Sequence, residues 1–232
     1  MLINLRNALM AGKRTPTAKD YVQSGLVAMW DGIENAGWGT HDASATTWNE
    51  LVSDTSVAVA SGVSWTANSA TASGLSARWA TIGTDTTLGG TIDSALSLNA
   101  VFKTTDSANL QFVLLDMLRR DCLGIAPDAL GIGLRQAIPI TTTSGKIWSL
   151  TANYESSSAQ TSDDAYVNGA ANANRGYANF SNPTTADIAI GGGYNSGWFS
   201  GEIYNLRVYS RKLTAQEIAA NYAIDKKRFN LP

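Results

Sequence analysis

The chain has 232 residues, of which 16% are charged, and its formal net charge is −2 with a pI near 5.4. This length suits one large or two small domains, and the weakly acidic balance excludes a basic field that attracts phosphate backbones, so nucleic acid is not an expected partner. The single cysteine, Cys122, excludes an internal disulfide framework, and no Cys or His spacing builds a zinc site.

Residues 1–20 are expected to form an N-terminal extension. Within it, residues 2–12 fit a short amphipathic helix with Leu2, Leu5 and Leu9 on one side. An arginine and an asparagine interrupt its apolar run, which is too short for the core of a secretory signal, and no segment of the chain approaches a membrane span. We therefore expect no signal peptide and no membrane partner, and we interpret the extension as an anchoring or assembly peptide.

From residue 21 onward, short apolar runs are separated by clusters of Gly, Asn, Asp, Ser and Thr, a pattern typical of many antiparallel strands. The expected strands span residues 25–30, 56–61, 94–104, 110–117, 130–134, 147–154, 164–169, 186–192 and 201–211. No internal repeat, charge block or proline-rich linker divides residues 21–232. The sequence therefore predicts one domain over residues 21–232.

In the last expected strand, three apolar residues alternate with two polar ones, namely Tyr204, Leu206 and Val208 with Asn205 and Arg207. Because side chains alternate between the two faces of a strand, this pattern predicts one buried and one solvated face.

The stretch after this strand changes to a helical period. Three large residues fall on one stripe: Ile218, Tyr222 and Phe229. Thr214 and Glu217 form a T-x-x-E capping box, and Leu213 and Ile218 occupy the positions of a hydrophobic staple. The sequence predicts that the helix begins directly after Thr214.

This closing run, FSGEIYNLRVYSRKLTAQEIAANYAIDKKRF at residues 199–229, resembles the end of the laminin-G-like, concanavalin A-like jelly rolls that occur as lectin and adhesion modules. DDAYVNGAA at residues 163–171 is similar to a hairpin of the same family, in which Asn168 and Gly169 supply the positive φ angles of a tight turn. The resemblance implies an all-β fold, a two-sheet antiparallel jelly-roll sandwich with a short C-terminal helix.

The opening of the domain also resembles this family. GLVAMWDGIENAG from residue 25 and TTWNELVS at residues 46–53 are similar to the first strand and its W-x-D-L-S-G continuation, although Glu50 and Asp54 depart from that pattern. The same opening resembles modules of gut bacteria and their phages. The resemblance implies a virion protein (head fibre, decoration or tail) that lies on the virion or at an extracellular surface.

The function implied is non-enzymatic carbohydrate binding or adhesion, with a glycan or bacterial cell-surface polysaccharide and virion proteins as partners. The alternative is a structural virion protein that makes subunit contacts, for example in a homo-oligomer such as a trimer. A glycan hydrolase is the third class, because several relatives are retaining glucanases.

Retaining glucanases need two carboxylates about 5 Å apart. No Glu-x-Asp-x-x-Glu run is present, and the pairs Asp163–Asp164 and Asp116–Asp121 lack the strand alternation. His41 is the only histidine, and no G-x-S-x-G elbow is present for a Ser-His-Asp arrangement. We therefore expect no enzymatic activity.

Sugar binding needs an exposed aromatic platform beside polar groups that bind hydroxyls. Two polar loops offer these residue types, and the candidate ligand-binding residues are Trp38, His41 and Asp42 in the first and Tyr194, Asn195 and Trp198 in the second. For Trp198 the alternative is packing at the sandwich edge or a subunit contact. The remaining tryptophans are expected in the core: Trp30, Trp48, Trp65, Trp79 and Trp148.

Calcium (Ca2+) is the candidate cofactor that the resemblance implies, since laminin-G-like modules often hold it at the rim of the sandwich through carboxylates and backbone oxygens. Asp31, Glu34, Asn35 and Asp42 are the residues available for it, but no fixed ligand spacing distinguishes them. The alternative is that they are solvated acids of a loop.

Overall fold

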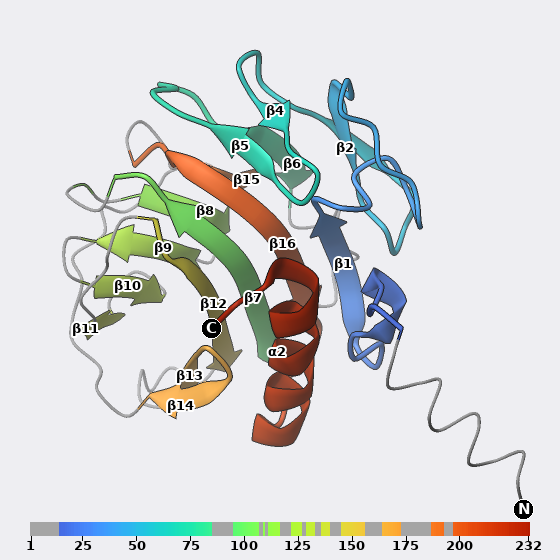
Figure 1. Cartoon of the computed structure of the whole chain (residues 1–232). Helices are drawn as coiled ribbons and strands as arrows, with labels where there is room; N and C mark the ends of the chain where they lie inside the picture. The colour runs from blue at the N-terminus through green and yellow to red at the C-terminus, as the bar shows by residue number, and fades with distance from the viewer. Residues whose placement is uncertain are drawn as a thin grey trace, which may run out of the picture.

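The protein is a sandwich of two antiparallel sheets with one helix packed across the outer face of the larger sheet (Figure 1). The computed structural model describes residues 14–84, 95–106, 109, 111–116, 122–126, 129–132, 136–139, 145–155, 164–172, 187–192 and 197–232. The predicted all-β, two-sheet antiparallel jelly-roll sandwich with a C-terminal helix is confirmed. The helix expected over residues 2–12 lies outside the described residues, and the assignment of residues 1–20 to an extension stays a prediction.

Within the described residues, the first sheet has eight strands. In spatial order, seven of them are β14 (Ala170–Asn172), β13 (Asp164–Val167), β12 (Ile147–Glu155), β7 (Ala95–Thr104), β16 (Gly201–Tyr209), β5 (Ala70–Ala72) and β4 (Ser64–Trp65). The eighth, β1 (Leu26–Asp31), pairs with the second half of β16, whereas β5 pairs with its first half. β1 and β5 therefore follow one another along the same edge of β16.

The second sheet has six strands in the described part of the chain. They are β11 (Gln136–Pro139), β10 (Ala129–Ile132), β9 (Cys122–Ala126), β8 (Gln111–Asp116), β15 (Asp187–Ile190) and β6 (Ala80–Thr84). β2 (Thr47–Asn49) and β3 (Ser56–Ala58) form a separate hairpin. The short 3-10 helix η1 (Ala18–Asp20) precedes β1, and α2 (Ala215–Phe229) follows β16.

Apolar side chains fill the space between the two sheets. The five tryptophans expected in the core are all buried, with at most 9% of any one exposed: Trp30, Trp48, Trp65, Trp79 and Trp148. Two of them, Trp48 and Trp65, meet edge to face with ring centroids 5.1 Å apart, an arrangement that aromatic rings prefer. The sequence-based assignment of these residues to the core is confirmed.

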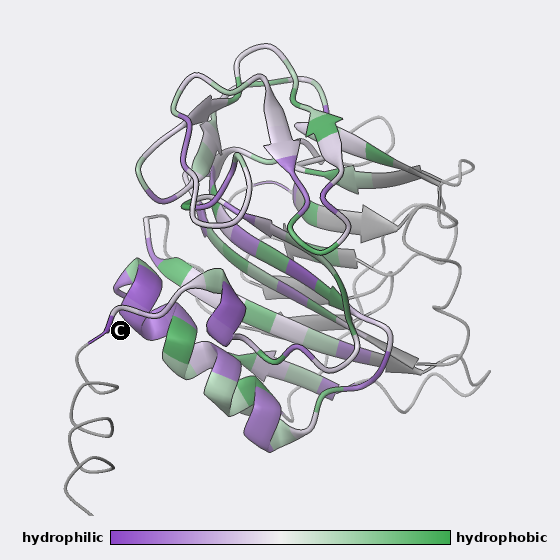
Figure 2. Cartoon of the chain, turned by 90° about the vertical axis from the view of Figure 1, so that its right-hand side faces the viewer, coloured by the Kyte–Doolittle hydropathy of each residue, from purple (hydrophilic) through white to green (hydrophobic). Residues whose placement is uncertain are grey.

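The outer face of β16 is not solvated, so the prediction of one wet face is wrong. α2 lies across this face (Figure 1), and Asn205 and Arg207 are completely buried beneath it. Tyr204 also lies on this side, with its ring 5.4 Å from that of Phe229, because the register shifts between Ile203 and Asn205. Figure 2 shows polar and apolar bands alternating along the long strands beneath the helix.

Local signals for the start of α2 and for the β13–β14 hairpin are confirmed. The Thr214 hydroxyl accepts from the Glu217 N–H at 3.2 Å, and the Glu217 carboxylate accepts from the Thr214 N–H at 2.9 Å. Leu213 and Ile218 share one buried cluster, as a hydrophobic staple requires. Asn168 and Gly169 both have positive φ, 50° and 76°, and form the two-residue turn between β13 and β14.

No described helix is long and apolar enough to cross a membrane.

Five charged side chains are buried between α2 and the first sheet, and we call them the buried ionic cluster: Asp31, Glu34, Arg207, Asp225 and Arg228. Arg207 lies 2.8 Å from Asp225, and Arg228 lies 2.6 Å from Asp31 and 3.1 Å from Glu34. The Tyr21 hydroxyl donates to Asp225 at 2.7 Å, and its ring lies 3.8 Å from the Arg207 guanidinium. Asp225 on α2 therefore binds both the segment before β1, through Tyr21, and the sheet, through Arg207.

Asp225→Ala leaves Arg207 buried without its counter-charge and is expected to lower the free energy of unfolding by about 3–5 kcal/mol. The control is Asp164→Ala, which removes the half-exposed partner of Lys212, 3.6 Å away, and is expected to cost about 1 kcal/mol or less. Urea denaturation checks both values. Equal effects of the two substitutions would contradict the importance of the buried pair.

Glu217 is expected to make the stability of α2 depend on pH. The pKa of Glu217 is lowered to about 2, chiefly because Arg211 donates hydrogen bonds to its carboxylate. Its contribution is therefore complete above the unfolded pKa of about 4.3 and is lost as the pH falls toward the folded value.

Glu217→Gln is accordingly expected to cost about 1 kcal/mol at pH 7 and less at pH 3. Chemical denaturation of both proteins at the two pH values measures the difference. A cost that stays constant between pH 7 and pH 3 would show that the charge of Glu217 contributes nothing.

Candidate functional site

Residues 32–46, which we call the rim loop, connect β1 to β2 at the edge of the sandwich. The loop turns sharply at its tip, where the Ala36 N–H donates to the Thr40 carbonyl at 3.2 Å and the Thr40 N–H donates to the Gly37 carbonyl at 2.9 Å. Gly37 and Gly39 both have positive φ, 119° and 70°, which glycine adopts without steric cost. Trp38 lies between them and is carried at the tip of this turn.

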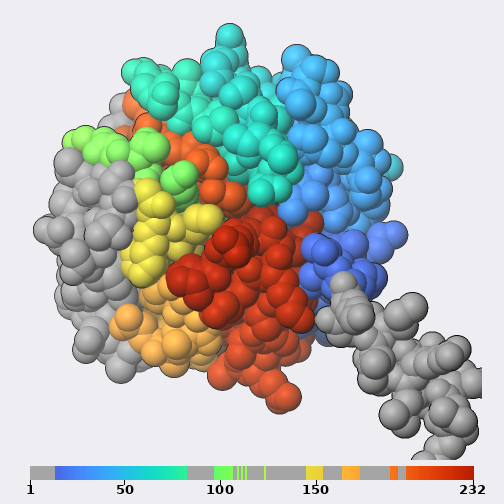
Figure 3. Space-filling view, in the orientation of Figure 1, coloured from blue at the N-terminus to red at the C-terminus, as the bar shows by residue number. Residues whose placement is uncertain are grey.

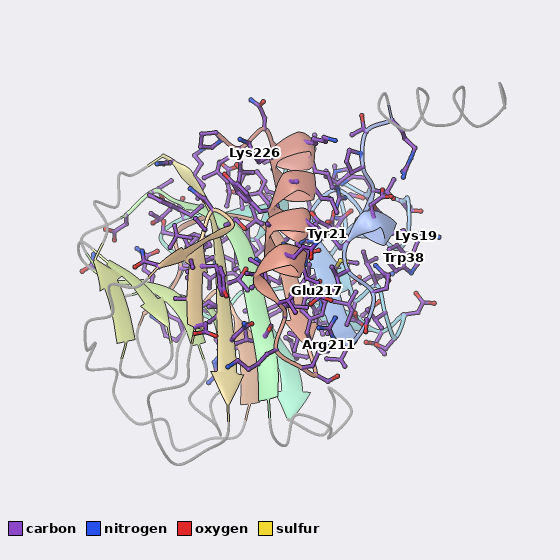
Figure 4. The ribbon with its side chains drawn as sticks, turned by 90° about the horizontal axis from the view of Figure 1, so that it is seen from below. Lys19, Tyr21, Trp38, Arg211, Glu217 and Lys226 are labelled. Carbon is purple, nitrogen blue, oxygen red and sulfur yellow. The ribbon has the colours of Figure 1, made fainter. Side chains whose placement is uncertain are left out.

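Trp38 is exposed at the surface (Figure 4). Its exposed fraction is 36%, and among the described residues only one other large hydrophobic side chain, Val52, is as accessible. The four residues that follow Trp38, Gly39 to Asp42, are exposed as well. An aromatic ring on a polar, solvent-facing turn can offer an apolar face to a ligand while its neighbours supply hydrogen bonds.

Buried Glu34 holds this turn from inside. One carboxylate oxygen accepts from the Gly39 N–H at 2.9 Å, and the other accepts from the Ala18 N–H at 2.9 Å and from Arg228 at 3.1 Å. Hydrogen bonds to a charged group are stronger than neutral ones. Glu34 therefore links the tip of the rim loop to η1 and to α2.

Asn35 positions the second half of the loop. Its side-chain amide donates to the Asp42 carbonyl and accepts from the Asp42 N–H, both at 2.8 Å. One carboxylate oxygen of Asp42 accepts from the Ser44 hydroxyl and N–H, and these hydrogen bonds lower the pKa of Asp42. The His41 ring lies with Nδ1 3.1 Å from the Gly32 carbonyl oxygen.

The structure thus places Trp38, His41 and Asp42 together on one exposed loop. Their role in binding a ligand stays a prediction. Sequence reasoning missed what holds them, because Glu34 and Asn35 look like ordinary loop residues until their hydrogen-bond partners are known.

The second predicted set of ligand-binding residues is only partly described. Tyr194 and Asn195 lie outside the described residues. Trp198 is half-buried, and its ring packs on Gly192, where an added Cβ would come within 2.7 Å of the ring. This contact agrees with the alternative that Trp198 packs the edge of the sandwich.

Two of the residues named for calcium, Asp31 and Glu34, are already bound to Arg228. Arg228 binds both oxygens of Asp31 and one oxygen of Glu34, so a cation at these carboxylates would have to displace the guanidinium. Burial raises the pKa of Asp31, although Arg228 opposes this effect. No group of three or more His, Cys, Asp or Glu side chains suited to a metal ion occurs in the described part of the chain.

Comparisons with known proteins agree with this architecture. The family described as the concanavalin A-like lectin/glucanases superfamily matches residues 139–219. A sialidase of Trypanosoma rangeli has a similar structure, with a TM-score of 0.61 and 17% identity over 91% of this chain. The chain has the concanavalin A-like fold. The resemblance inferred from the closing strand, the helix and the hairpin is thereby confirmed.

The similar solved structures differ in how much of their own length aligns with this chain. The chain covers 33% of the sialidase, about a third of its length. The CBM40 domain of a Ruminococcus gnavus IT-sialidase, solved with alpha2,3 sialyllactose, aligns with 61% of this chain and 91% of its own, at 13% identity and a TM-score of 0.43. No curated protein sequence is significantly similar to the chain.

Glu34→Gln is expected to loosen the rim loop. A glutamine side chain offers one acceptor oxygen, so either the Gly39 or the Ala18 N–H faces an amide group that also donates. We expect faster hydrogen exchange at one of these amides and a loss of about 1–3 kcal/mol in the free energy of unfolding.

The matched control is Asp42→Asn, which keeps the oxygen that Ser44 contacts and is expected to change the free energy of unfolding by less than about 1 kcal/mol. Hydrogen exchange followed by mass spectrometry reports on both variants. Unchanged exchange throughout the rim loop in the Glu34 variant would contradict the anchoring role.

Proposed function

We propose that the chain is a non-enzymatic carbohydrate-binding module and that the rim loop is its contact surface. The observation that carries this proposal is the exposed Trp38 ring on a turn fixed from inside by Glu34. The apolar face of a sugar ring packs on an aromatic side chain, and a fixed platform loses little conformational entropy when it binds. The lectin/glucanase family description supports the same class of ligand.

His41 and Asp42 are the residues proposed to bind sugar hydroxyls beside this ring. Both are exposed, and Ser44 contacts only one oxygen of Asp42, so the other oxygen has no hydrogen-bond partner among the described residues. An ionised carboxylate accepts hydrogen bonds from hydroxyl groups at short distance. The glycan on this proposal is a bacterial cell-surface polysaccharide.

The arrangement of the acids supports a binding role over hydrolysis. Asp31 and Glu34 are close enough to share Arg228, but both are buried and engaged by it, so neither faces a ligand. A retaining glycosidase needs two accessible carboxylates about 5 Å apart. Asp164, from one of the acid pairs in the sequence, lies near Lys212 instead.

The biological setting that we propose is display on a phage particle, which rests on the resemblance of the opening stretch to phage-associated modules. The second candidate function is a structural one, in which exposed apolar side chains contact neighbouring subunits. The exposed side chains of Trp38 and Val52 favour it, because exposed apolar groups also mark protein interfaces. Mass spectrometry of purified particles tests the setting.

Trp38→Ala is expected to weaken binding to the recognised glycan at least about tenfold, which corresponds to about 1.4 kcal/mol. The free energy of unfolding is expected to change by about 1 kcal/mol or less, because the ring is exposed. A glycan array identifies the ligand, and isothermal titration calorimetry measures the affinities of both proteins.

Val52→Ala is the control, since it truncates the other exposed hydrophobic residue without touching the proposed platform. It is expected to leave glycan affinity unchanged. Wild-type protein that binds no glycan, while both variants dissociate an oligomer in sedimentation experiments, would favour the structural function.

A further inference from the structure

Lys19 lies against the Trp38 platform, although the two residues come from different segments. The Lys19 ammonium nitrogen is 5.2 Å from the centroid of the Trp38 ring (Figure 4). Lys19 belongs to η1, and Figure 3 shows the first described residues adjoining both α2 and the segment that follows β1. The surface around Trp38 therefore includes a cation that the rim loop itself does not supply.

The buried carboxylate of Glu34 holds Lys19 and Trp38 close to one another. Its two oxygens accept from the N–H groups of Ala18 and Gly39, each at 2.9 Å. These two residues are the chain neighbours of Lys19 and Trp38. One side chain thus sets the backbone positions of both the cation and the aromatic ring.

The Lys19 ammonium has no paired carboxylate in the described part of the chain. The neighbouring Asp20 is bound to Arg14 and to the Thr17 N–H. A lysine ammonium carries three donors, and a contact with an exposed ring uses none of them fully. An anionic group on a ligand can therefore bind Lys19 while the rest of the ligand packs on Trp38.

We propose that Lys19 determines specificity at the rim loop and that the ligand is an acidic saccharide, with a carboxylate or sulfate on or next to the ring that packs on Trp38. This inference rests on the proposed carbohydrate-binding function. A charge-assisted hydrogen bond is about twice as strong as a neutral one. Lys19 therefore favours the acidic sugar over its neutral counterpart, and Asp42 binds hydroxyls on the uncharged part of the ligand.

The test compares saccharides that differ only in the acidic group. Polygalacturonate is paired with its fully methyl-esterified form, and a sulfated galactan is paired with its desulfated form. Affinity electrophoresis and calorimetry are carried out with wild-type protein, Lys19→Gln, Lys19→Arg and Trp38→Ala. Lys226→Gln is the matched control, because Lys226 also lies over an aromatic ring, that of Tyr222, but on α2 (Figure 4).

We expect wild-type protein to prefer one acidic member over its neutral counterpart and to lose this preference at least about fivefold in Lys19→Gln. Lys19→Arg and Lys226→Gln are expected to keep it, and the carboxylate and sulfate pairs show which group is recognised. Several results would overturn the inference: no binding to any acidic member, equal binding within each pair, an unaffected Lys19→Gln variant, or equally tight binding to single-stranded DNA.

The two proposals fail in different ways. If Trp38→Ala abolishes glycan binding while Lys19→Gln does not alter it, only the acidic preference is wrong. If Trp38→Ala leaves glycan binding intact, the rim loop is not the contact surface. If wild-type protein binds no saccharide at all, the proposed carbohydrate-binding function itself is wrong.

Discussion

The structure depends on the burial of two arginines and three carboxylates between α2 and the outer face of the first sheet. Removing such groups from water costs several kcal/mol per ion, and their attraction compensates only when the geometry is good and the hydrogen bonds are nearly complete. Arg228 satisfies this condition through both oxygens of Asp31 and one oxygen of Glu34. Apolar residues would hold α2 on the sheet equally well, but charged groups also fix its position along the sheet.

The buried ionic cluster also positions residues at the surface. Arg228 on α2 binds Glu34, and Glu34 binds the backbone at Ala18 and at Gly39. The position of the Trp38 ring is therefore set by a helix near the other end of the chain. The binding role that we propose for the rim loop rests on this fixed position of Trp38.

Sequence signals were reliable where the determining contacts are local. The capping box at Thr214, the turn at Asn168 and the long strands each depend on residues within a few positions of one another. β2, β4 and β5, of two or three residues each, escaped detection because so few residues show no periodicity.

The site was harder to predict, since its determinants are distant in sequence. Glu34 was interpreted as a loop acid or a calcium ligand because Arg228, its actual partner, comes near the end of the chain. The polar outer face of β16 was assigned to solvent for the same reason: alternation along a strand shows that two faces differ, but not what covers each face. Arg207 on that face already indicated a partner, because a central strand rarely buries an arginine without one. Asp225, on the helix that follows, is that partner, and the same helix carries Arg228, which binds Glu34 of the rim loop.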